Sequence, residues 1–231
     1  MKVKNSQFTV AMLALTLAAV SGYAQSQPSS KVTAKTANLT LLDWSTTGTG
    51  GWQTLFSNTI KTANQKDLFI SASFEVGLYT DTLVSSKNMT RDTSSAEASV
   101  QVRVLLDGVP VEPGPVVFGR RKQTLSATLE GAIAGCLSID PITGGIVLDP
   151  DCVLPETIQL ILETMDAASF NFVAVDVPQG VHTITVQAQV DTATAVQTGS
   201  AQAKGLIGKG SMMVESVRLI KNPNVEVPTL D

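Results

Sequence analysis

Apolar and polar residues alternate along much of the chain. Every second residue is apolar over residues 68–78 and 98–106, and the same period recurs over residues 124–129 and 184–190. Successive side chains of a strand point to opposite faces, so a period of two is typical of a strand with one buried face. These segments therefore predict strands whose apolar side chains face a core.

Three further segments, at residues 158–163, 170–177 and 211–221, are apolar and rich in β-formers, and they predict additional strands. Residues 155–168 begin with a proline, which fits the first position of a helix, but their alternation favours a strand. Residues 193–210 are rich in Ala, Gly, Thr and Gln, and they allow either a long loop or a weak pair of strands.

Turn-forming residues separate these segments. Asp107-Gly108 directly follows an apolar run, which is a strong signal for a tight turn. Many short strands without a convincing helix predict an all-β fold, an antiparallel β-sandwich that is jelly-roll-like and forms a single domain. We place this domain at residues 37–222, between a flexible leader at 25–36 and a C-terminal tail at 223–231.

Residues 1–24 have the layout of a secretory signal peptide. Lys2 and Lys4 precede an apolar run at residues 8–20, and Gly22 and Ala24 supply the small residues of a cleavage site. The run is shorter than the roughly 20 residues that span a bilayer. We expect cleavage after Ala24 and a secreted or periplasmic protein whose mature form is not held in a membrane.

The charge balance argues against nucleic acid as a partner. Cleavage would remove two of the 16 Lys and Arg and none of the 20 Asp and Glu, so the formal net charge would change from −4 to −6. Nucleic-acid binding needs clustered Lys and Arg that neutralise phosphates. The basic run Arg120-Arg121-Lys122 is more typical of a solvated face than of a phosphate site.

Cys136 and Cys152 are the only cysteines, and they bracket the segment CLSIDPITGGIVLDPDC. Two Cys and one His do not complete a structural zinc site, and the spacing is wider than that of a Cys-x-x-Cys redox pair. Paired cysteines of an exported chain persist as disulfides. We expect a short hairpin or compact loop that is closed by a Cys136–Cys152 disulfide.

Three carboxylates in or beside this loop raise the question of calcium. Asp140, Asp149 and Asp151 could gather around a hard cation. Because no EF-hand or nonapeptide spacing is present, their neighbouring Pro and Gly residues favour turn formation instead. We predict no metal site.

Catalytic motifs are absent from the sequence. His182 is the only His, it follows a turn, and it is expected to be a buried or half-buried structural residue. No nucleophile motif or phosphate loop is present, so we predict neither an enzyme nor a cofactor. A glycosidase-like carboxylate pair stays open, with these candidates: Glu75, Glu97, Glu130, Asp166 and Asp176.

Trp44 and Trp52 bracket a flexible Gly- and Thr-rich segment at residues 45–51. If both rings are exposed, they could form a stacking platform for a sugar. If they are buried, they belong to the core or close the loop. Trp44 and Trp52 are the candidate ligand-binding residues of the chain.

Residues 66–80, 102–127 and 180–192 resemble exported bacterial β-sandwich proteins of unassigned function. The Gly-x-His-x-Ile-x-Val segment that begins at Gly180 also resembles the late strand of jelly-roll heads, in C1q-like domains and at fibre tips, that form trimers. The resemblance implies a β-sandwich and the possibility of a homo-oligomer such as a trimer. It transfers no functional residue.

These observations favour a non-enzymatic protein that mediates binding or assembly at the cell surface, with a protein or glycan partner. The alternative is a carbohydrate-binding module or glycan-active protein that uses the loop between Trp44 and Trp52. A third hypothesis is a structural subunit whose edge strands pair between chains.

Overall fold

The computed structural model describes residues 31–37, 48–87, 89–133 and 135–219. These residues are almost entirely in strands, and their one helical element is a single 3-10 turn. None of them forms a helix that is long and apolar enough to cross a membrane. The elements, in chain order, are β1 (Lys31–Ala37), β2 (Gly48–Thr49), β3 (Gln53–Thr62), β4 (Lys66–Ser86), β5 (Thr90–Leu106), β6 (Val109–Pro110), β7 (Val116–Leu129), β8 (Leu137–Ile139), β9 (Ile146–Leu148), η1 (Pro150–Cys152), β10 (Glu156–Val177), β11 (Gly180–Val196) and β12 (Ser200–Val217).

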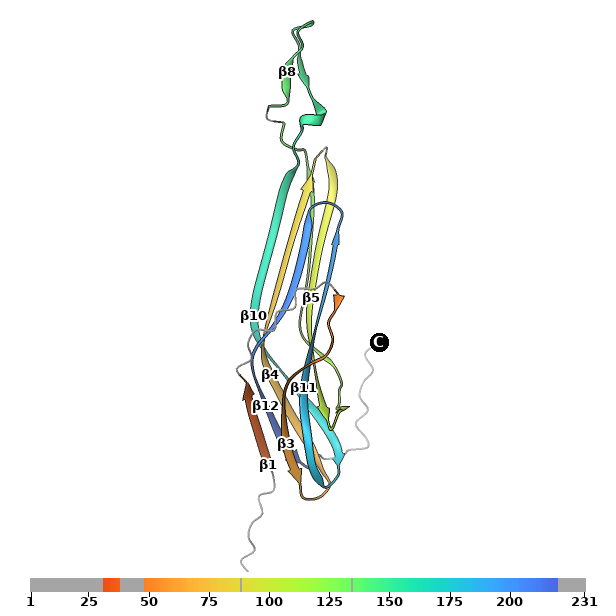
Figure 1. Cartoon of the computed structure of the whole chain (residues 1–231), viewed down its shortest axis with the longest axis vertical. Coiled ribbons are helices and arrows are strands. Elements are labelled where there is room, and N and C mark those ends of the chain that lie inside the picture. The colour runs from red at the N-terminus through yellow and green to blue at the C-terminus, as the bar shows by residue number, and fades with distance from the viewer. Residues whose placement is uncertain (1–30, 38–47, 88, 134, 220–231) are drawn as a thin grey trace, which may run out of the picture.

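Two antiparallel sheets form a sandwich. The first has the order β1-β12-β4-β10, and in the second β3 and β5 flank β11 while β7 pairs with the other side of β5. When the strands of two or three residues are left out and the other eight are numbered along the chain, the two sheet orders are 1-8-3-6 and 2-7-4-5. These orders are those of a jelly roll. The predicted all-β, jelly-roll-like sandwich is therefore confirmed. The sandwich is elongated, and a small hairpin projects from one end (Figure 1).

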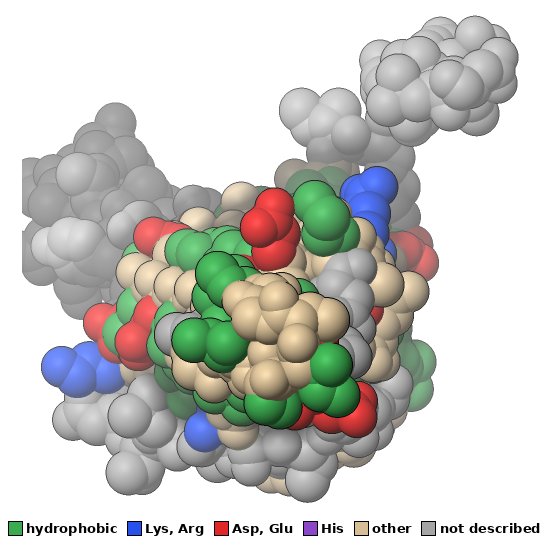
Figure 2. Space-filling model, turned by 90° about the horizontal axis from the view of Figure 1, so that it is seen from above, with side chains coloured by type: hydrophobic (Ala, Val, Ile, Leu, Met, Phe, Trp, Pro, Cys, Tyr) green, Lys and Arg blue, Asp and Glu red, His purple; other side chains and the backbone are tan. Residues whose placement is uncertain are grey.

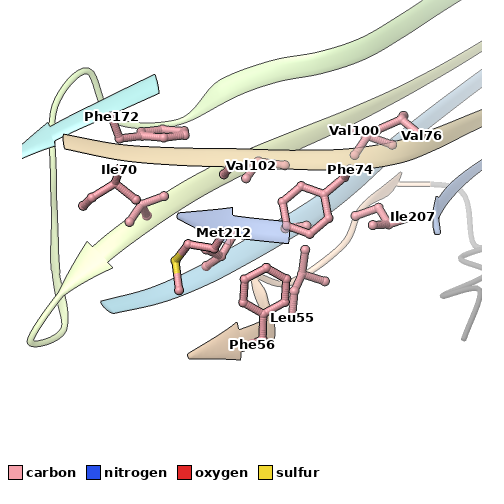
Figure 3. Close-up of a cluster of buried hydrophobic side chains, with 14 of the residues drawn as sticks. Leu55, Phe56, Ile70, Phe74, Val76, Val100, Val102, Phe172, Ile207 and Met212 are labelled. Carbon is pink, nitrogen blue, oxygen red and sulfur yellow. The ribbon is translucent and has the colours of Figure 1, made fainter. Parts of the chain in front are cut away.

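We call the end that carries β8 and β9 distal and the opposite end basal. The basal part holds the apolar core, which the alternating residues of the long strands supply from both sheets. Phe56 and Phe74 stack with ring centroids 5.5 Å apart, and Phe118 meets Phe74 edge-on at 6.1 Å. Figure 3 shows Phe56 and Phe74 with Ile70 and Met212 between the sheets.

The interior changes toward the distal end. Inward positions of β4 there are Thr80 and Thr82, and Ser94 and Gln123 face them from the other sheet; all four are buried. Thr80 Oγ1 donates to Gln123 Oε1 at 2.8 Å, and Gln123 Nε2 donates to the Leu160 carbonyl at 2.7 Å. Buried polar groups are tolerated when they are hydrogen-bonded, and this network satisfies that condition.

One boundary prediction differs from the structure, and one open alternative is decided by it. Residues 31–36, expected in the flexible leader, form most of β1, because an edge strand needs main-chain pairing with β12 more than it needs apolar side chains. Residues 193–210, left open between a loop and strands, continue β11 to Val196 and start β12 at Ser200. The tight turn at Asp107-Gly108 is confirmed, with φ values of 50° and 88°. The predicted signal peptide and the tail at 223–231 lie outside the described residues.

Candidate functional site

The distal hairpin carries the predicted disulfide. Cys136 and Cys152 are bonded with their Cα atoms 5.3 Å apart, and β8 pairs with β9 so that Leu137 faces Leu148 and Ile139 faces Ile146. The Asp149 amide donates to the Cys136 carbonyl at 2.9 Å, which closes the base of the hairpin. Both the hairpin and its disulfide confirm the sequence prediction.

The carboxylates of this hairpin organise its turns. Asp140 accepts hydrogen bonds from the Thr143 hydroxyl at 2.6 Å and from the Ile142 amide at 2.9 Å, and these bonds lower the pKa of Asp140. Asp149 accepts from the Asp151 amide at 3.0 Å. Within the described part of the chain, no three His, Cys, Asp or Glu side chains lie close enough to hold a metal ion. The hydrogen bonds of Asp140 and Asp149 stabilise turns of the hairpin.

The same hairpin exposes almost all of its apolar side chains. Ile142 is 92% exposed, Ile146 is 75% exposed and Ile139 is 73% exposed. Figure 2 looks along the molecule onto this end and shows hydrophobic side chains gathered around it, with Asp and Glu beside them. Exposed apolar groups that gather in one place are typical of an interaction surface.

A second exposed apolar segment lies directly below, on the distal half of β10. Inward-facing Ile158, Leu160 and Leu162 are 43%, 40% and 42% exposed, and outward-facing Ile161 is 53% exposed. Among the described strands, β10 pairs with β4 alone, so its other edge carries no neighbour in the sheet. We call the hairpin of residues 136–152 and the strand segment 156–169 together the distal surface.

The neighbouring edge of the second sheet is β7, whose inward residues Leu125 and Leu129 are half-buried. Among the described strands, none pairs with the outer edge of β7 or with that of the distal half of β10. Arg121 bridges the two strands lower down, where it donates to the Thr164 hydroxyl at 2.7 Å and the Leu78 carbonyl at 3.2 Å. Arg121 is therefore partly structural, whereas the sequence favoured a solvated face for the whole basic run.

The charged side chains of the distal surface are all acidic. No Lys or Arg occurs between Lys122 and Lys204, and the distal surface contains several Asp and Glu. Natural edge strands are commonly protected from pairing by Lys, and this one has none. Sequence reasoning missed the surface, although the lysine-free interval and the apolar run Leu160-Ile161-Leu162, which breaks the alternation, were visible signals.

Only part of the predicted stacking platform can be placed. Trp52 is half-buried, and the Arg103 guanidinium lies over its ring at 4.2 Å from the centroid. Arg103 is held by Gln187, whose Oε1 accepts its Nε–H at 2.9 Å. Trp44 lies outside the described residues. One face of Trp52 is thus covered by a cation–π contact, and sugar binding by Trp44 and Trp52 stays a prediction.

His182 is buried at the basal end, as the sequence predicted. Its Nδ1 lies 2.7 Å from Asp107 Oδ2, and its Nε2 lies 2.9 Å from the Pro178 carbonyl. Two acceptors around one ring favour the doubly protonated form, and the hydrogen bond to Asp107 raises the pKa of His182. Among the candidate carboxylates, Glu97 pairs with Arg120 at 2.6 Å and Glu75 accepts from the Lys209 amide.

Comparison with known proteins identifies no relative by sequence. No family model matches the chain. No curated protein matches it either.

Solved structures give distant likenesses only. The structure of the Gx strain of infectious bursal disease virus is 14% identical, covers 85% of this chain and 33% of its own, and has a TM-score of 0.31. The VP2 subviral particle of infectious bursal disease virus is 10% identical, covers 87% of this chain and 44% of its own, and has a TM-score of 0.19. This chain spans less than half the length of either structure. At these TM-scores the likenesses assign neither a family nor a function.

Proposed function

We propose that this chain is a non-enzymatic, exported assembly protein that works at the cell surface and contacts its partner through the distal surface. The observation that carries the proposal is the concentration of exposed apolar side chains on the hairpin and on the free edge of β10. Both elements lie at the same end of a molecule whose core is at the other end.

The unfavourable free energy of exposed apolar area explains why the distal surface favours association. Apolar area in contact with water is unfavourable by about 25 cal/mol per Å², so a fold gains by covering it. The side chains of the hairpin have no core to enter, because β8 and β9 form a separate two-stranded sheet beyond the sandwich. A partner that covers the distal surface recovers this free energy.

Export is supported by two features. Residues 1–24 have the charge and hydropathy layout of a signal peptide. The Cys136–Cys152 disulfide also suits an oxidising compartment outside the cytoplasm, and closing a loop of this length stabilises by about 3 kcal/mol in the chain-entropy model.

The test is the solution mass of residues 25–231, measured by light scattering after size exclusion over a wide range of concentration. We expect the mass to rise above that of a monomer. A distal variant, Ile142→Ser with Ile146→Ser and Leu160→Lys, is expected to weaken association by about a hundredfold, since each change removes apolar contact or adds a charge.

A matched control changes three exposed apolar residues that lie outside the distal surface. Val32 on β1, Val109 and Val181 are 55%, 67% and 67% exposed. The variant Val32→Lys with Val109→Ser and Val181→Ser is expected to associate as the unaltered chain does. A chain that stays monomeric at every concentration, or a distal variant that associates as well as the control, would reject the proposal.

A further inference from the structure

We infer that the partner of β10 is the same strand of a second copy, paired antiparallel about a two-fold axis at Leu160. The inference rests on the proposed function and names its contact. It begins from the free edge of β10, whose distal segment Glu156–Ser169 has no strand beside it among the described residues.

The free edge is long and confined to the distal half. Toward the basal end the outer edge of β10 is closed, because the Val173 amide donates to the Glu112 carbonyl at 3.0 Å. The open segment above it extends for about 45 Å at roughly 3.3 Å per residue. An unpaired edge of this length is a template for another strand.

The sequence of the segment is complementary to itself in one register. With Leu160 opposite Leu160, Ile158 lies opposite Leu162 and both Glu residues lie opposite Thr, Glu156 facing Thr164 and Glu163 facing Thr157. Antiparallel strands place such pairs side by side on one face, where apolar pairs stabilise and like charges destabilise.

Neighbouring registers are less favourable. An axis at Ile161 would place Glu156 opposite Asp166 twice, and an axis at Glu163 would place this residue opposite itself. An axis at Leu162 would place carboxylates opposite Ile158 and Ile161. The axis at Leu160 is the one of these four that pairs apolar residues across the inward face and places both Glu residues opposite Thr, while Asp166 lies beyond the paired stretch 156–164.

Pairing in this register would also cover apolar side chains that are partly exposed at this side of the sandwich. Ile158, Leu160 and Leu162 point inward yet are 40–43% exposed, beside half-buried Leu125 and Leu129 of β7. A second β10 would cover this apolar row from the side. Gln123 already donates to the Leu160 carbonyl, so its amide must share that acceptor or turn away when the strands pair.

Cysteine scanning tests the register directly. In an antiparallel pair the Cα atoms of residues that lie opposite each other are about 4.5–5.5 Å apart, which suits a disulfide. Leu160→Cys is therefore expected to cross-link to itself under mild oxidation. Leu162→Cys, equally exposed and on the same face, is not, because its own copy would lie four residues away along the strand pair.

A mixture gives the decisive control. Ile158→Cys and Leu162→Cys are each expected to remain uncross-linked alone and to form a mixed dimer when they are combined. Leu160→Lys alone is expected to weaken self-association by at least about tenfold, and Val32→Lys on β1 to leave it unchanged.

The outcomes separate this inference from the proposed function. If the unaltered chain associates but Leu160→Cys does not cross-link and Leu160→Lys associates normally, the β10 contact is wrong and another part of the distal surface mediates assembly. If Leu162→Cys cross-links as readily as Leu160→Cys, the register is wrong. A monomer at every concentration rejects the proposed function and the inference together.

Discussion

The basal and distal halves of the sandwich share the same long strands, yet they differ inside and outside. The basal interior is made of Phe, Ile, Leu, Val and Met, with Phe74 and Phe172 almost completely buried. The distal interior is made largely of Ala, Ser and Thr, held together by the hydrogen bonds of Gln123. Outside, the distal half gathers exposed apolar side chains on the hairpin and on β10.

The edge strands of the two sides of the molecule also differ in how they are protected from pairing. On the side of β1 and β3 the exposed residues include Lys31, Lys35 and Lys61, and Lys35 Nζ donates to the Ser57 carbonyl at 2.8 Å across the two sheets. The distal half of β10 has no lysine, and none of the described strands pairs with its outer edge. Lysines and short strands discourage edge pairing, so one edge is protected and the other is open.

The difference indicates that the basal end supplies stability and the distal end supplies a surface for recognition. Apolar burial is the dominant favourable term in folding, and it is concentrated at the basal end. The distal end gains less folding free energy from apolar burial in its own interior, and it leaves apolar area exposed for a partner. Stability and recognition can therefore be altered independently.

The largest effect is expected in the basal core. Phe74→Ala removes a ring that contacts Phe56 and Phe118 and is 2% exposed, and such truncations cost about 3–5 kcal/mol. Leu162→Ala, on an inward position of the distal half that is 42% exposed, should cost about 1 kcal/mol or less. Chemical denaturation of dilute protein measures both, and equal losses would contradict the division.

A smaller effect is expected in the distal interior. Gln123→Ala leaves the buried Thr80 hydroxyl without its acceptor, and an unpaired buried group costs about 1–3 kcal/mol. Gln123→Leu combined with Thr80→Val and Thr82→Val replaces the network by apolar groups and should be close to neutral. The exposed neighbour Thr124→Ala is the control, with a change within about 0.5 kcal/mol. A triple variant that is less stable than Gln123→Ala would show that the network itself stabilises the distal half.

The sequence predicted the regular parts of the fold because they depend on local patterns. The period of two over residues 68–78 places Ile70 and Phe74 inward, as observed, and Asp107-Gly108 forms the expected turn. The disulfide followed from the cysteine count and the turn residues between Cys136 and Cys152. Each of these features is fixed by residues close together in the chain.

The distal surface was not predictable in the same way. Ile158, Leu160 and Leu162 alternate like core residues, and their exposure follows from the position of β10 at the edge of its sheet. Edge position depends on sheet order, which is set by pairings more than 70 residues apart, such as Leu160 with Thr82. The strand β1 was missed for the opposite reason, since its polar residues gave no apolar signal.

The smallest effect is expected at the basal end, where the division can be tested by pH. The amide of Thr183 and the His182 ring lower the pKa of Asp107, and the hydrogen bond to Asp107 raises the pKa of His182. Since the folded pKa of His182 lies above its ordinary value, its contribution is complete below about pH 6.5 and is lost as the pH rises through the raised pKa. The folded pKa of Asp107 lies below its ordinary value, so its contribution is complete above about pH 3.8 and is lost as the pH falls.

The pair should therefore stabilise the basal end fully between about pH 3.8 and 6.5, by on the order of 1 kcal/mol because Asp107 is half exposed. Asp107→Asn keeps a residue that tolerates the positive φ of this turn and removes the charge. In the unaltered chain we expect the unfolding free energy to fall as the pH rises above 6.5. In the Asp107→Asn variant we expect this fall to be absent. The distal network of Gln123 contains no titrating group, so Gln123→Leu should leave that decline intact. If Gln123→Leu abolishes it while Asp107→Asn does not, the pH response arises outside the basal pair, and the two halves are coupled more tightly than their separate interiors indicate.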